Sequence, residues 1–438
     1  MELSEQQLIA FNKYIQGENI FITGPGGCGK SELIRKIYHD AIEKKKNIHV
    51  CALTGCAAVL LNCKAKTLHS WAGIGLGTGD VLSYVNKIRK NPYFSQQWKN
   101  TDILVVDEVS MMSTYLFEIL NIIGKNVRSN SRLPFGGIQI ILSGDFYQLP
   151  PVGNKDYLNS THFCFESSEW NSVFPIQNQI QLIKIFRQTD SVYSSILNQI
   201  REGRIKRKSI DILQQYVERV VSPDLLIQPT KIYPTRHLVD SVNNHNMLSL
   251  NTEEHEFKAK KEYPEKFETN ISVIDIQKEF EFLSNNLPCE PTLRLKIGAQ
   301  VMCVVNIKIN DELLLCNGSQ GIVTSFSSGF PVVKYNNGFE MIMTLHTWMS
   351  EKITGLCISQ IPLILAWALT IHKSQGSTLD AAEIDIGDNV FECGQTYVAL
   401  SRVKSLDGLY LSSFNYNKIK INKKVKEFYE ELTKHQAL

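Results

Sequence analysis

The alternation of apolar runs and amphipathic stretches along the chain predicts strands that alternate with helices. Positions 4–16 carry an apolar face with helical spacing, and positions 19–23 have the pattern of a short buried strand. A Gly-rich turn follows, and positions 31–46 then have the pattern of an amphipathic helix. Further short β-branched runs lie at 47–53, 103–107 and 139–142, separated by helical stretches. This alternation favours an α/β fold, in which helices cover both faces of a parallel sheet.

A second α/β unit begins near Ile180 and is interrupted by a segment of a different pattern. Its predicted elements are strands at 232–233, 362–369 and 383–386 and helices at 191–203, 236–250 and 420–433. Between them, short apolar runs at 295–345 are separated by turn pairs, which predict hairpins. These pairs are Asn317-Gly318, Ser328-Gly329 and Asn337-Gly338. We therefore expect a small antiparallel β-barrel, preceded by an extended lead-in at 252–290, inserted into the second α/β unit.

The predicted domain boundaries follow from these patterns. We expect a first α/β domain at 1–180 with a small wedge insertion around 73–100, a second α/β domain in two parts at 181–255 and 346–438, and the barrel with its lead-in at 256–345.

Composition excludes some classes of protein and leaves others open. Lys plus Arg number 46 against 44 Asp plus Glu, so the net charge of +2 excludes a histone-like binder but not a local basic groove. The ten cysteines form no CxxC pair and no zinc-like pattern with histidine, which favours a reducing compartment. The N-terminus lacks a signal or transit pattern, and the apolar run at 361–371 is too short for a bilayer. We expect a soluble intracellular protein, cytoplasmic or nuclear, with no membrane partner and a solvated lysine face on its terminal helix.

The strongest chemical motif is the segment GPGGCGKS at 24–31, which fits GxxxxGK[ST] between a strand and a helix. The backbone N–H groups of such a loop bind phosphate oxygens. Lys30 supplies a cation for the β- and γ-phosphates, and the Ser31 hydroxyl is a magnesium ligand. The candidate nucleotide-binding residues are Gly24, Gly26, Gly27, Cys28, Gly29, Lys30 and Ser31. The alternative is a Gly-rich turn with no ligand, which the flanking strand and helix disfavour.

Two carboxylates end the apolar run that follows, at Asp107 and Glu108. Asp107 is the candidate that holds magnesium through water, and Glu108 is the candidate that polarises the attacking water. An ordinary helix cap is the alternative for an isolated Asp-Glu pair. Because the pair accompanies a phosphate loop, we expect hydrolysis of the nucleotide as well as binding.

Three more polar residues complete the predicted catalytic set. Gln148, in GDFYQLPP after another apolar strand, is a candidate sensor of the γ-phosphate, although in isolation the segment would be a turn. Arg187 and Arg402 are candidates for the arginine that stabilises the transition state from outside the phosphate-loop domain. A surface charge is the alternative for each arginine.

Six segments occur in one order along nearly the whole chain: GPGGCGKS, VVDEVSMM, PFGGIQIILSGDFYQLPPV, FRQ, AWALTIHKSQGSTLD and YVALSRVKSLDGL. Together they resemble the PIF family of superfamily 1 DNA helicases, the 5′-to-3′ branch related to RecD-like enzymes. The resemblance implies two RecA-like P-loop motor domains with a small Src-homology-like barrel inserted in the second. It also implies that Gln7 reads adenine, that Gly376 borders the nucleotide, that Arg187 and Arg402 are arginine fingers, and that ATP and Mg²⁺ are the cofactors. Cys28 departs from the threonine usual in the family.

The resemblance also implies contacts with single-stranded DNA in both motor domains. The candidate DNA-binding residues are Thr54, Gly55, Thr67, His69, Thr370, His372, Lys373 and Gln375. Without the resemblance, the two histidines would more often be core residues with satisfied hydrogen bonds. Tyr93 and Phe94 are candidates for a strand-separating wedge, although the sequence names no particular pin residue.

The function implied is that of an ATP-dependent DNA helicase that translocates 5′ to 3′ on single-stranded DNA and unwinds duplex or forked DNA. G-quadruplexes and RNA–DNA hybrids are further candidate substrates, and we expect a monomer in solution. The alternative is a DNA-stimulated ATPase that translocates without separating strands. A P-loop kinase and a G-quadruplex binder with secondary ATPase activity are two other classes. The kinase leaves the HKSQG and ALSR segments without a role.

Overall fold

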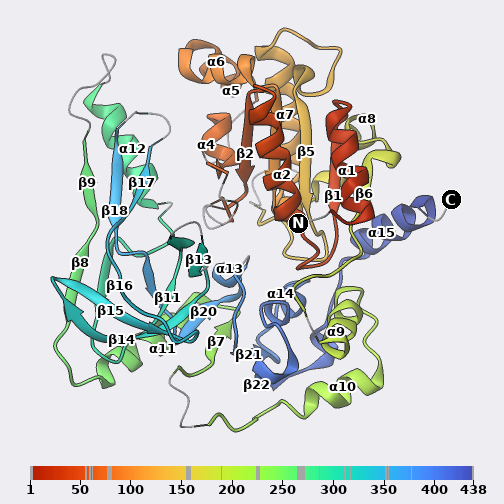
Figure 1. The fold of residues 1–438 in the computed structure, drawn as a ribbon. Helices are drawn as coiled ribbons and strands as arrows, with labels where there is room; N and C mark the ends of the chain where they lie inside the picture. Colours follow the sequence, from red (N-terminus) through yellow and green to blue (C-terminus); the bar gives the residue numbers. More distant parts are fainter. Residues whose placement is uncertain are drawn as a thin grey trace. The chain divides into compact units, whose positions relative to one another are not determined.

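The structure of the chain is a computed structural model, and its fold is drawn in Figure 1. It describes residues 3–54, 57–58, 61, 63–75, 81–153, 159–188, 190–222, 227–263, 272–285, 287–309, 312–315, 317–350, 353, 355–375 and 377–436. The chain folds as two compact units: the first comprises Met1–Ile210, Phe391–Ser401 and Asn415–Leu438, and the second comprises Asp211–Val390 and Arg402–Phe414. These units group the chain differently from the predicted domains, whose boundaries stay a prediction.

The first unit is built on a six-stranded sheet in the order β3-β2-β4-β5-β1-β6. Every pair of neighbouring strands in it is parallel. The strands are β1 (Ile20–Thr23), β2 (Ile48–Ala52), β3 (Lys66–Thr67), β4 (Ile103–Asp107), β5 (Gln139–Gly144) and β6 (Gln179–Gln181). The parallel sheet predicted from the alternating pattern is confirmed.

Helices of the first unit cover both faces of this sheet (Figure 1). The helices assigned to the first unit are α1 (Glu5–Ile15), α2 (Lys30–Glu43), α4 (Leu68–Ala72), α5 (Val81–Lys90), α6 (Pro92–Asn100), α7 (Thr114–Val127), α8 (Trp170–Val173), α9 (Ser191–Arg201), α14 (Gln395–Leu400) and α15 (Lys423–Gln436). Helix α10 (Arg207–Gln214) spans the boundary between the units. Successive side chains of a strand point to opposite faces, so Phe21 of β1 packs in one core while Ile20 and Ile22 pack in the other.

The terminal helix α15 contributes to the first of these cores. Val425, Tyr429 and Leu432 are buried in the same cluster as Phe21. Lys423 lies on the opposite face and is 89% exposed. Of the predicted lysine face, Lys423, Lys424 and Lys426 lie on the helix while Lys418 and Lys420 precede it, and the buried face of the helix is a structural part of the first unit.

The second unit contains a four-stranded parallel sheet in the order β20-β7-β21-β22. Its strands are β7 (Thr230–Tyr233), β20 (Ala368–Thr370), β21 (Ala382–Ile386) and β22 (Leu409–Phe414), accompanied by α11 (Arg236–Ser249) and α13 (Ile371–Ser374). The single strand predicted at 362–369 is wrong. It divides at Ala366, whose N–H donates to Gln300 O and whose carbonyl accepts from the Thr230 hydroxyl.

The remainder of the second unit is antiparallel. A five-stranded sheet runs in the order β16-β15-β14-β11-β19. Its strands are β11 (Gln300–Cys303), β14 (Gln320–Ser327), β15 (Phe330–Tyr335), β16 (Glu340–Ile342) and β19 (Leu363–Leu365). Smaller sheets contain β8 (His255–Lys258) with β10 (Thr292–Leu295), β12 (Ile307–Ile309) with β13 (Glu312–Leu315), and β9 (Lys260–Glu262) with β18 (Cys357–Gln360) and β17 (His346–Met349), beside helix α12 (Val273–Asn285).

Two of the three predicted hairpin turns are confirmed. Ser328-Gly329 joins β14 to β15, with positive φ angles at both residues, and Asn337-Gly338 joins β15 to β16. The prediction at Asn317-Gly318 is wrong, because the strands on either side of that turn do not pair with each other. The Gly318 N–H instead donates to Cys303 O of β11.

Among the helices of the described residues, we find none whose length and apolar character would let it cross a membrane.

Candidate active site

The phosphate loop lies between β1 and α2. Gly24, Gly27 and Gly29 have positive φ angles of 147°, 81° and 84°, which residues with a side chain rarely adopt. At Gly27 a Cβ atom would lie 2.4 Å from Arg187 Cβ, so glycine is required there for space as well as for conformation. The loop leads into the N-terminus of α2 at Lys30, where free backbone N–H groups and the helix dipole favour phosphate.

The charged and hydroxyl side chains of the motif lie on this loop. Lys30 Nζ donates to the carbonyl oxygens of Gly24 at 2.7 Å and Pro25 at 3.1 Å. Its distance to Cys28 Sγ is 3.7 Å, and Cys28 is buried. Ser31 is half-buried in the first turn of α2. The ammonium and the hydroxyl thus both lie where the motif predicts them, at the end of the loop and the start of α2.

Gln7 is held against the same loop. Ser4 is the N-cap of α1, and Ser4 and Gln7 form a reciprocal capping box there. Gln7 Nε2 donates to Gly29 O at 3.1 Å, and the side chain is only 4% exposed. This places Gln7 beside the nucleotide motif, and its role in reading adenine stays a prediction.

The Asp-Glu pair stands at the carboxyl end of β4. Asp107 is 5% exposed, and burial raises the pKa of its carboxyl while the positive charges of Lys30 and Arg35 oppose the shift. Glu108 has φ 57° and ψ 40°, a left-handed conformation that costs about 1–2 kcal/mol for a residue with a side chain. Strain of this kind is often found at functional sites. It is consistent with a carboxylate held in a required orientation.

Gln148 follows β5 and is 5% exposed. Its backbone N–H donates to Asp145 O at 2.9 Å. The N-cap of α14, Gly394, has φ 79°, and a Cβ there would lie 2.5 Å from Gln148 O. The start of α14 therefore packs directly on the segment that carries Gln148.

A buried ion pair anchors the same segment. Asp145 is fully buried and accepts from Arg201 Nε at 2.8 Å and Nη2 at 2.9 Å. The Arg201 guanidinium lies 4.6 Å from the ring centroid of Tyr147 and 5.1 Å from that of Tyr429. The Tyr429 hydroxyl lies 2.6 Å from Thr23 Oγ1 at the end of β1. The network thus joins α9, α15 and the strand before the phosphate loop, and sequence reasoning did not find it.

The two predicted arginine fingers lie in different units. Arg187 belongs to the first unit and packs over Gly27, and the neighbouring Phe186 N–H donates to Gly27 O at 2.8 Å. Burial lowers the pKa of the Arg187 guanidinium, and the nearby Tyr397, Glu108 and Cys28 oppose that shift.

Arg402 belongs to the second unit, is 2% exposed and donates from Nη1 to Ser377 O at 3.3 Å. The structure therefore brings Arg187 to the phosphate loop within one unit, whereas Arg402 is buried and belongs to the other unit. The expectation that both arginines lie outside the phosphate-loop domain depends on the domain boundaries, which stay a prediction.

The predicted DNA-binding residues of the first unit lie at helix starts. Thr54 Oγ1 accepts from Ala57 N at 3.2 Å, and Thr67 Oγ1 caps α4 by accepting from Ser70 N at 3.4 Å. Burial lowers the pKa of His69, which favours its neutral form. Gly55 lies outside the described residues.

Those of the second unit lie around α13. Thr370 Oγ1 accepts from Lys373 N at 3.0 Å, Lys373 is exposed, and Gln375 is 9% exposed. The side chain of His372 and the whole of Gly376 lie outside the described residues. The structure thus brings Gln7 and Arg187 against the phosphate loop, and DNA contact stays a prediction for both sets of residues.

Two residues beside the loop were not singled out from the sequence. Gln188 is 9% exposed and lies close to Gly27, and neither amide atom of its side chain has a hydrogen-bond partner among the described residues. The Tyr397 hydroxyl accepts from Gly26 N at 2.8 Å. The only available signal was their place inside the FRQ and YVALSR segments.

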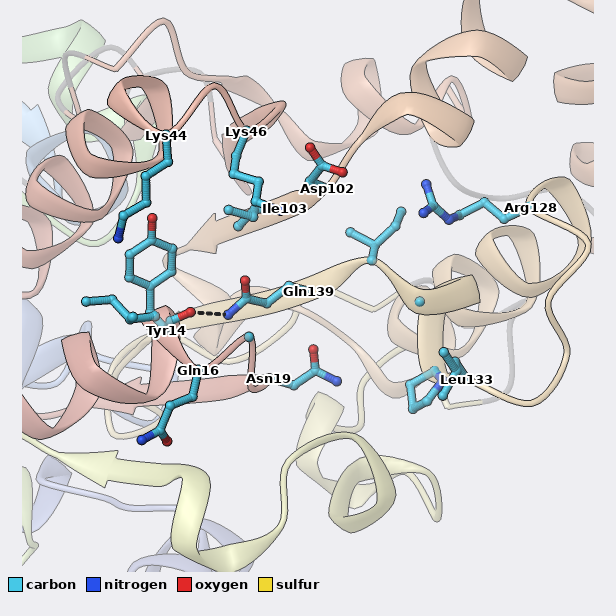
Figure 2. Close-up of a pocket in the computed structure, with 15 residues that line it drawn as sticks. Tyr14, Gln16, Asn19, Lys44, Lys46, Asp102, Ile103, Arg128, Leu133 and Gln139 are labelled. Carbon is cyan, nitrogen blue, oxygen red and sulfur yellow. Dashed lines mark hydrogen bonds between the residues drawn. The ribbon is translucent and has the colours of Figure 1, made fainter.

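A separate cavity of about 470 Å³ lies at the amino ends of β4 and β5, opposite to the carboxyl ends of the strands in the first sheet (Figure 2). Arg128 on its wall donates to the carbonyls of Trp98, Lys99 and Thr101. Gln139 Nε2 donates to Tyr14 O at 2.9 Å. These groups hold the fold together, and ligands of such sheets bind at the carboxyl ends of the strands. We therefore place the candidate active site at the phosphate loop.

Comparison with known proteins gives one family. The profile of PIF1-like helicases matches residues 2–211, and that of the DNA helicase Pif1 2B domain matches residues 281–326. The ATP-dependent DNA helicase PIF1 of Homo sapiens is 35% identical over 442 residues, which cover all of this chain and 65% of that protein. The chain thus spans about two thirds of the length of the human relative.

Solved structures of similar proteins match this chain over nearly its whole length. The crystal structure of Pif1 helicase from Candida albicans is 35% identical with a TM-score of 0.78, and the match covers 99% of this chain and 100% of that one. The crystal structure of Bacteroides Pif1 bound to single-stranded DNA is 27% identical with a TM-score of 0.67, covering 100% and 98%. These matches confirm the predicted RecA-like motor fold and the inserted antiparallel domain. The chain belongs to the PIF1-like helicase family.

Proposed function

We propose that this chain is an ATP-dependent DNA helicase that moves 5′ to 3′ on single-stranded DNA and unwinds forked duplex DNA. The observation that carries the proposal is the grouping of Lys30, Glu108 and Arg187 around one glycine-rich loop. A cation for the phosphates, a carboxylate for water and an arginine for developing charge are the parts that phosphoryl transfer requires. The names of the relatives, which describe ATP-dependent DNA helicases, support the same activity.

We propose ATP and Mg²⁺ as the cofactors. The oxygen donors of Ser31 and Asp107 fit Mg²⁺, which prefers hard oxygen ligands and retains several waters. Held by these two residues, the ion would supply positive charge that offsets the charge of the phosphates. A nearby cation would also favour the ionised form of Asp107, whose pKa burial raises.

The protein groups then have separate tasks. The backbone N–H groups from Gly26 to Ser31 hold the phosphates, and Lys30 neutralises charge on the β- and γ-oxygens. Glu108 orients and polarises the attacking water, and Gln148 senses the γ-phosphate. Arg187, already packed on the loop, stabilises charge on the transferred phosphoryl group, a contribution worth about 10³–10⁵ in rate for arginine fingers.

The coupling to DNA is proposed through the second unit. Arg402 directly follows the C-cap of α14 in the chain and belongs to the second unit, so a contribution from it to ATP turnover would link both units. Thr54, Thr67 and His69 in the first unit, with Thr370, Lys373 and Gln375 in the second, are the proposed contacts to the strand. Gly55, His372 and Gly376 are retained as proposals from the sequence. We also propose a monomer and keep the predicted domain boundaries.

Strand displacement tests the proposal. Two partial duplexes, one with a 5′ single-stranded tail and one with a 3′ tail, are incubated with the protein, ATP and Mg²⁺, and Lys30→Ala serves as the inactive control. We expect the wild type to unwind the 5′-tailed duplex only. Unwinding from the 3′ tail alone would contradict the direction. ATPase activity stimulated by single strands, without unwinding of either duplex, would replace the helicase by the translocase alternative.

A further inference from the structure

One donor of the phosphate loop is already used by a side chain of α14. The Gly26 N–H donates to the Tyr397 hydroxyl at 2.8 Å, across 371 positions of sequence. Tyr397 is 3% exposed, so water does not compete for this hydrogen bond. A Cβ on Gly26 would lie 3.6 Å from this hydroxyl and 3.7 Å from Ser401 Cβ. The end of α14 therefore packs directly on the loop.

Arg187 lies in the same contact. Its Nη1 is 3.5 Å from Ser401 O, and its guanidinium is close enough to Tyr397 for the two to interact electrostatically. Arg187 covers Gly27 while Tyr397 covers Gly26, so two neighbouring loop residues are each in contact with a residue from a distant segment. The phosphate loop is therefore connected to α14 by the bond to Tyr397 and, through Arg187, to the C-cap residue Ser401.

Phosphate and the Tyr397 hydroxyl need the same kind of donor. A glycine-rich loop binds phosphate through its backbone N–H groups, and a phosphate oxygen is a stronger acceptor than a phenol because a charge-assisted hydrogen bond is about twice as strong as a neutral one. A phosphate that takes the Gly26 N–H must break the bond to Tyr397. Since all six residues of α14 are buried, a shift of Tyr397 is expected to move the helix with it.

We propose that Tyr397 is a positioning residue that competes with nucleotide phosphate for the Gly26 N–H and reports phosphate binding to α14. The proposal rests on the proposed function, because it requires the loop to bind a nucleotide. Displacement of the hydroxyl frees α14, and the movement passes along the chain to Arg402, which follows the C-cap Ser401. Tyr397 therefore opposes nucleotide binding and links it to the second predicted finger.

The test compares Tyr397→Phe with Tyr193→Phe. Tyr193 is also fully buried, and its hydroxyl donates to Leu400 O of the same helix at 2.7 Å. Each change removes one buried hydroxyl that has a hydrogen bond involving α14, but only Tyr397 has its partner in the phosphate loop. Binding of ADP and of a non-hydrolysable ATP analogue, each with Mg²⁺, is measured by isothermal titration, after circular dichroism confirms that each variant is folded.

We expect Tyr397→Phe to bind nucleotide about two- to tenfold more tightly, the range given by the loss of one competing hydrogen bond. Tyr193→Phe should bind as the wild type does. In the ATPase assay, Tyr397→Phe should lower KM and also lower kcat, because phosphate no longer displaces a group that moves α14. A purely structural role of the hydroxyl would not lower KM.

Unchanged or weaker nucleotide binding by Tyr397→Phe would overturn the inference, since the hydroxyl would then not compete with phosphate. Equal tightening in both variants would also overturn it, because the effect would come from loosening α14 in general. If the wild type bound neither ADP nor the analogue, the proposed function itself would fail. The two failures are therefore distinguishable.

Discussion

The ion pair between Asp145 and Arg201 provides the sharpest stability test of the first unit. Arg201→Ala removes two hydrogen bonds, at 2.8 and 2.9 Å, to a carboxylate that is fully buried. Burial alone would lower the pKa of Arg201, yet its interaction with Asp145 outweighs burial and the pKa is raised. The pair is therefore charged in the folded protein.

The expected loss of stability follows from what remains after the substitution. Removing one partner leaves Asp145 buried without its counter-charge, which costs about 3–5 kcal/mol. The contacts of the guanidinium with the rings of Tyr147 and Tyr429 are lost as well, at about 0.5–2 kcal/mol each. Because these contributions share one side chain they are not additive, and we expect a total loss of about 3–5 kcal/mol.

Urea unfolding followed by tryptophan fluorescence is the assay. Three of the five tryptophans, Trp71, Trp98 and Trp170, are buried in the core of the first unit, so the signal includes the unit that contains the ion pair. The matched control is Arg204→Ala, which removes an exposed pair with Glu430 at 3.0 Å. Such pairs contribute about 0–1 kcal/mol. Arg201 is the last residue of α9 and Arg204 lies three residues beyond it, and both contact residues of α15, so burial is the main difference between them.

The reasoning would be refuted if Arg201→Ala lost no more stability than Arg204→Ala. A double variant gives a second check. Adding Asp145→Asn to Arg201→Ala removes the orphaned charge, so the double variant should be more stable than Arg201→Ala alone. If it were less stable by the full sum of the single effects, the two residues would not be coupled.

Four other predictions concern the loop and one half-buried histidine. Lys30→Ala should abolish ATPase activity and leave the affinity for single-stranded DNA unchanged in a fluorescence anisotropy assay. Arg187→Ala should lower kcat for ATP by about 10³-fold or more with nucleotide affinity changed only a few-fold; hydrolysis at the wild-type rate would show that Arg187 is no finger. Gly27→Ala should prevent nucleotide binding in titration calorimetry, because its Cβ would lie 2.4 Å from Arg187 Cβ at a φ of 81°. Burial lowers the pKa of His49 to about 4, so as pH falls from 7 to 5 this histidine is protonated in the unfolded chain but not in the folded one. The free energy of unfolding therefore drops by about 2 kcal/mol. His49→Gln should remove that part of the pH dependence, which urea titrations at both pH values would measure.

The sequence predicted those parts of the fold and site that depend on neighbouring residues. The phosphate loop, the strand that ends at Asp107 and the strand–helix alternation are local patterns, because each depends on residues within one or two elements. Glu108 was predicted from its place beside Asp107, although nothing in the sequence indicated its left-handed backbone.

The remaining features depend on contacts between distant segments. The Tyr429 hydroxyl reaches Thr23 across 406 positions, and Tyr397 reaches Gly26 across 371. No periodicity signals either pairing, since tyrosine at these positions is equally suited to an ordinary helix face. The division of the strand predicted at 362–369 also depends on distant residues, because the backbone of Ala366 is hydrogen-bonded to Gln300 and Thr230.

The burial of α15 against the first sheet has a consequence for how the protein is made. Val425, Tyr429 and Leu432 complete a core whose other members include Phe21 and Phe146. During translation the ribosome delivers residue 210 well before residue 425, roughly 10–50 s earlier at 5–20 residues per second. For that interval the nascent first unit lacks part of its core and the hydroxyl that holds Thr23. Maturation of the ATP site therefore waits for the last helix of the first unit to be synthesised.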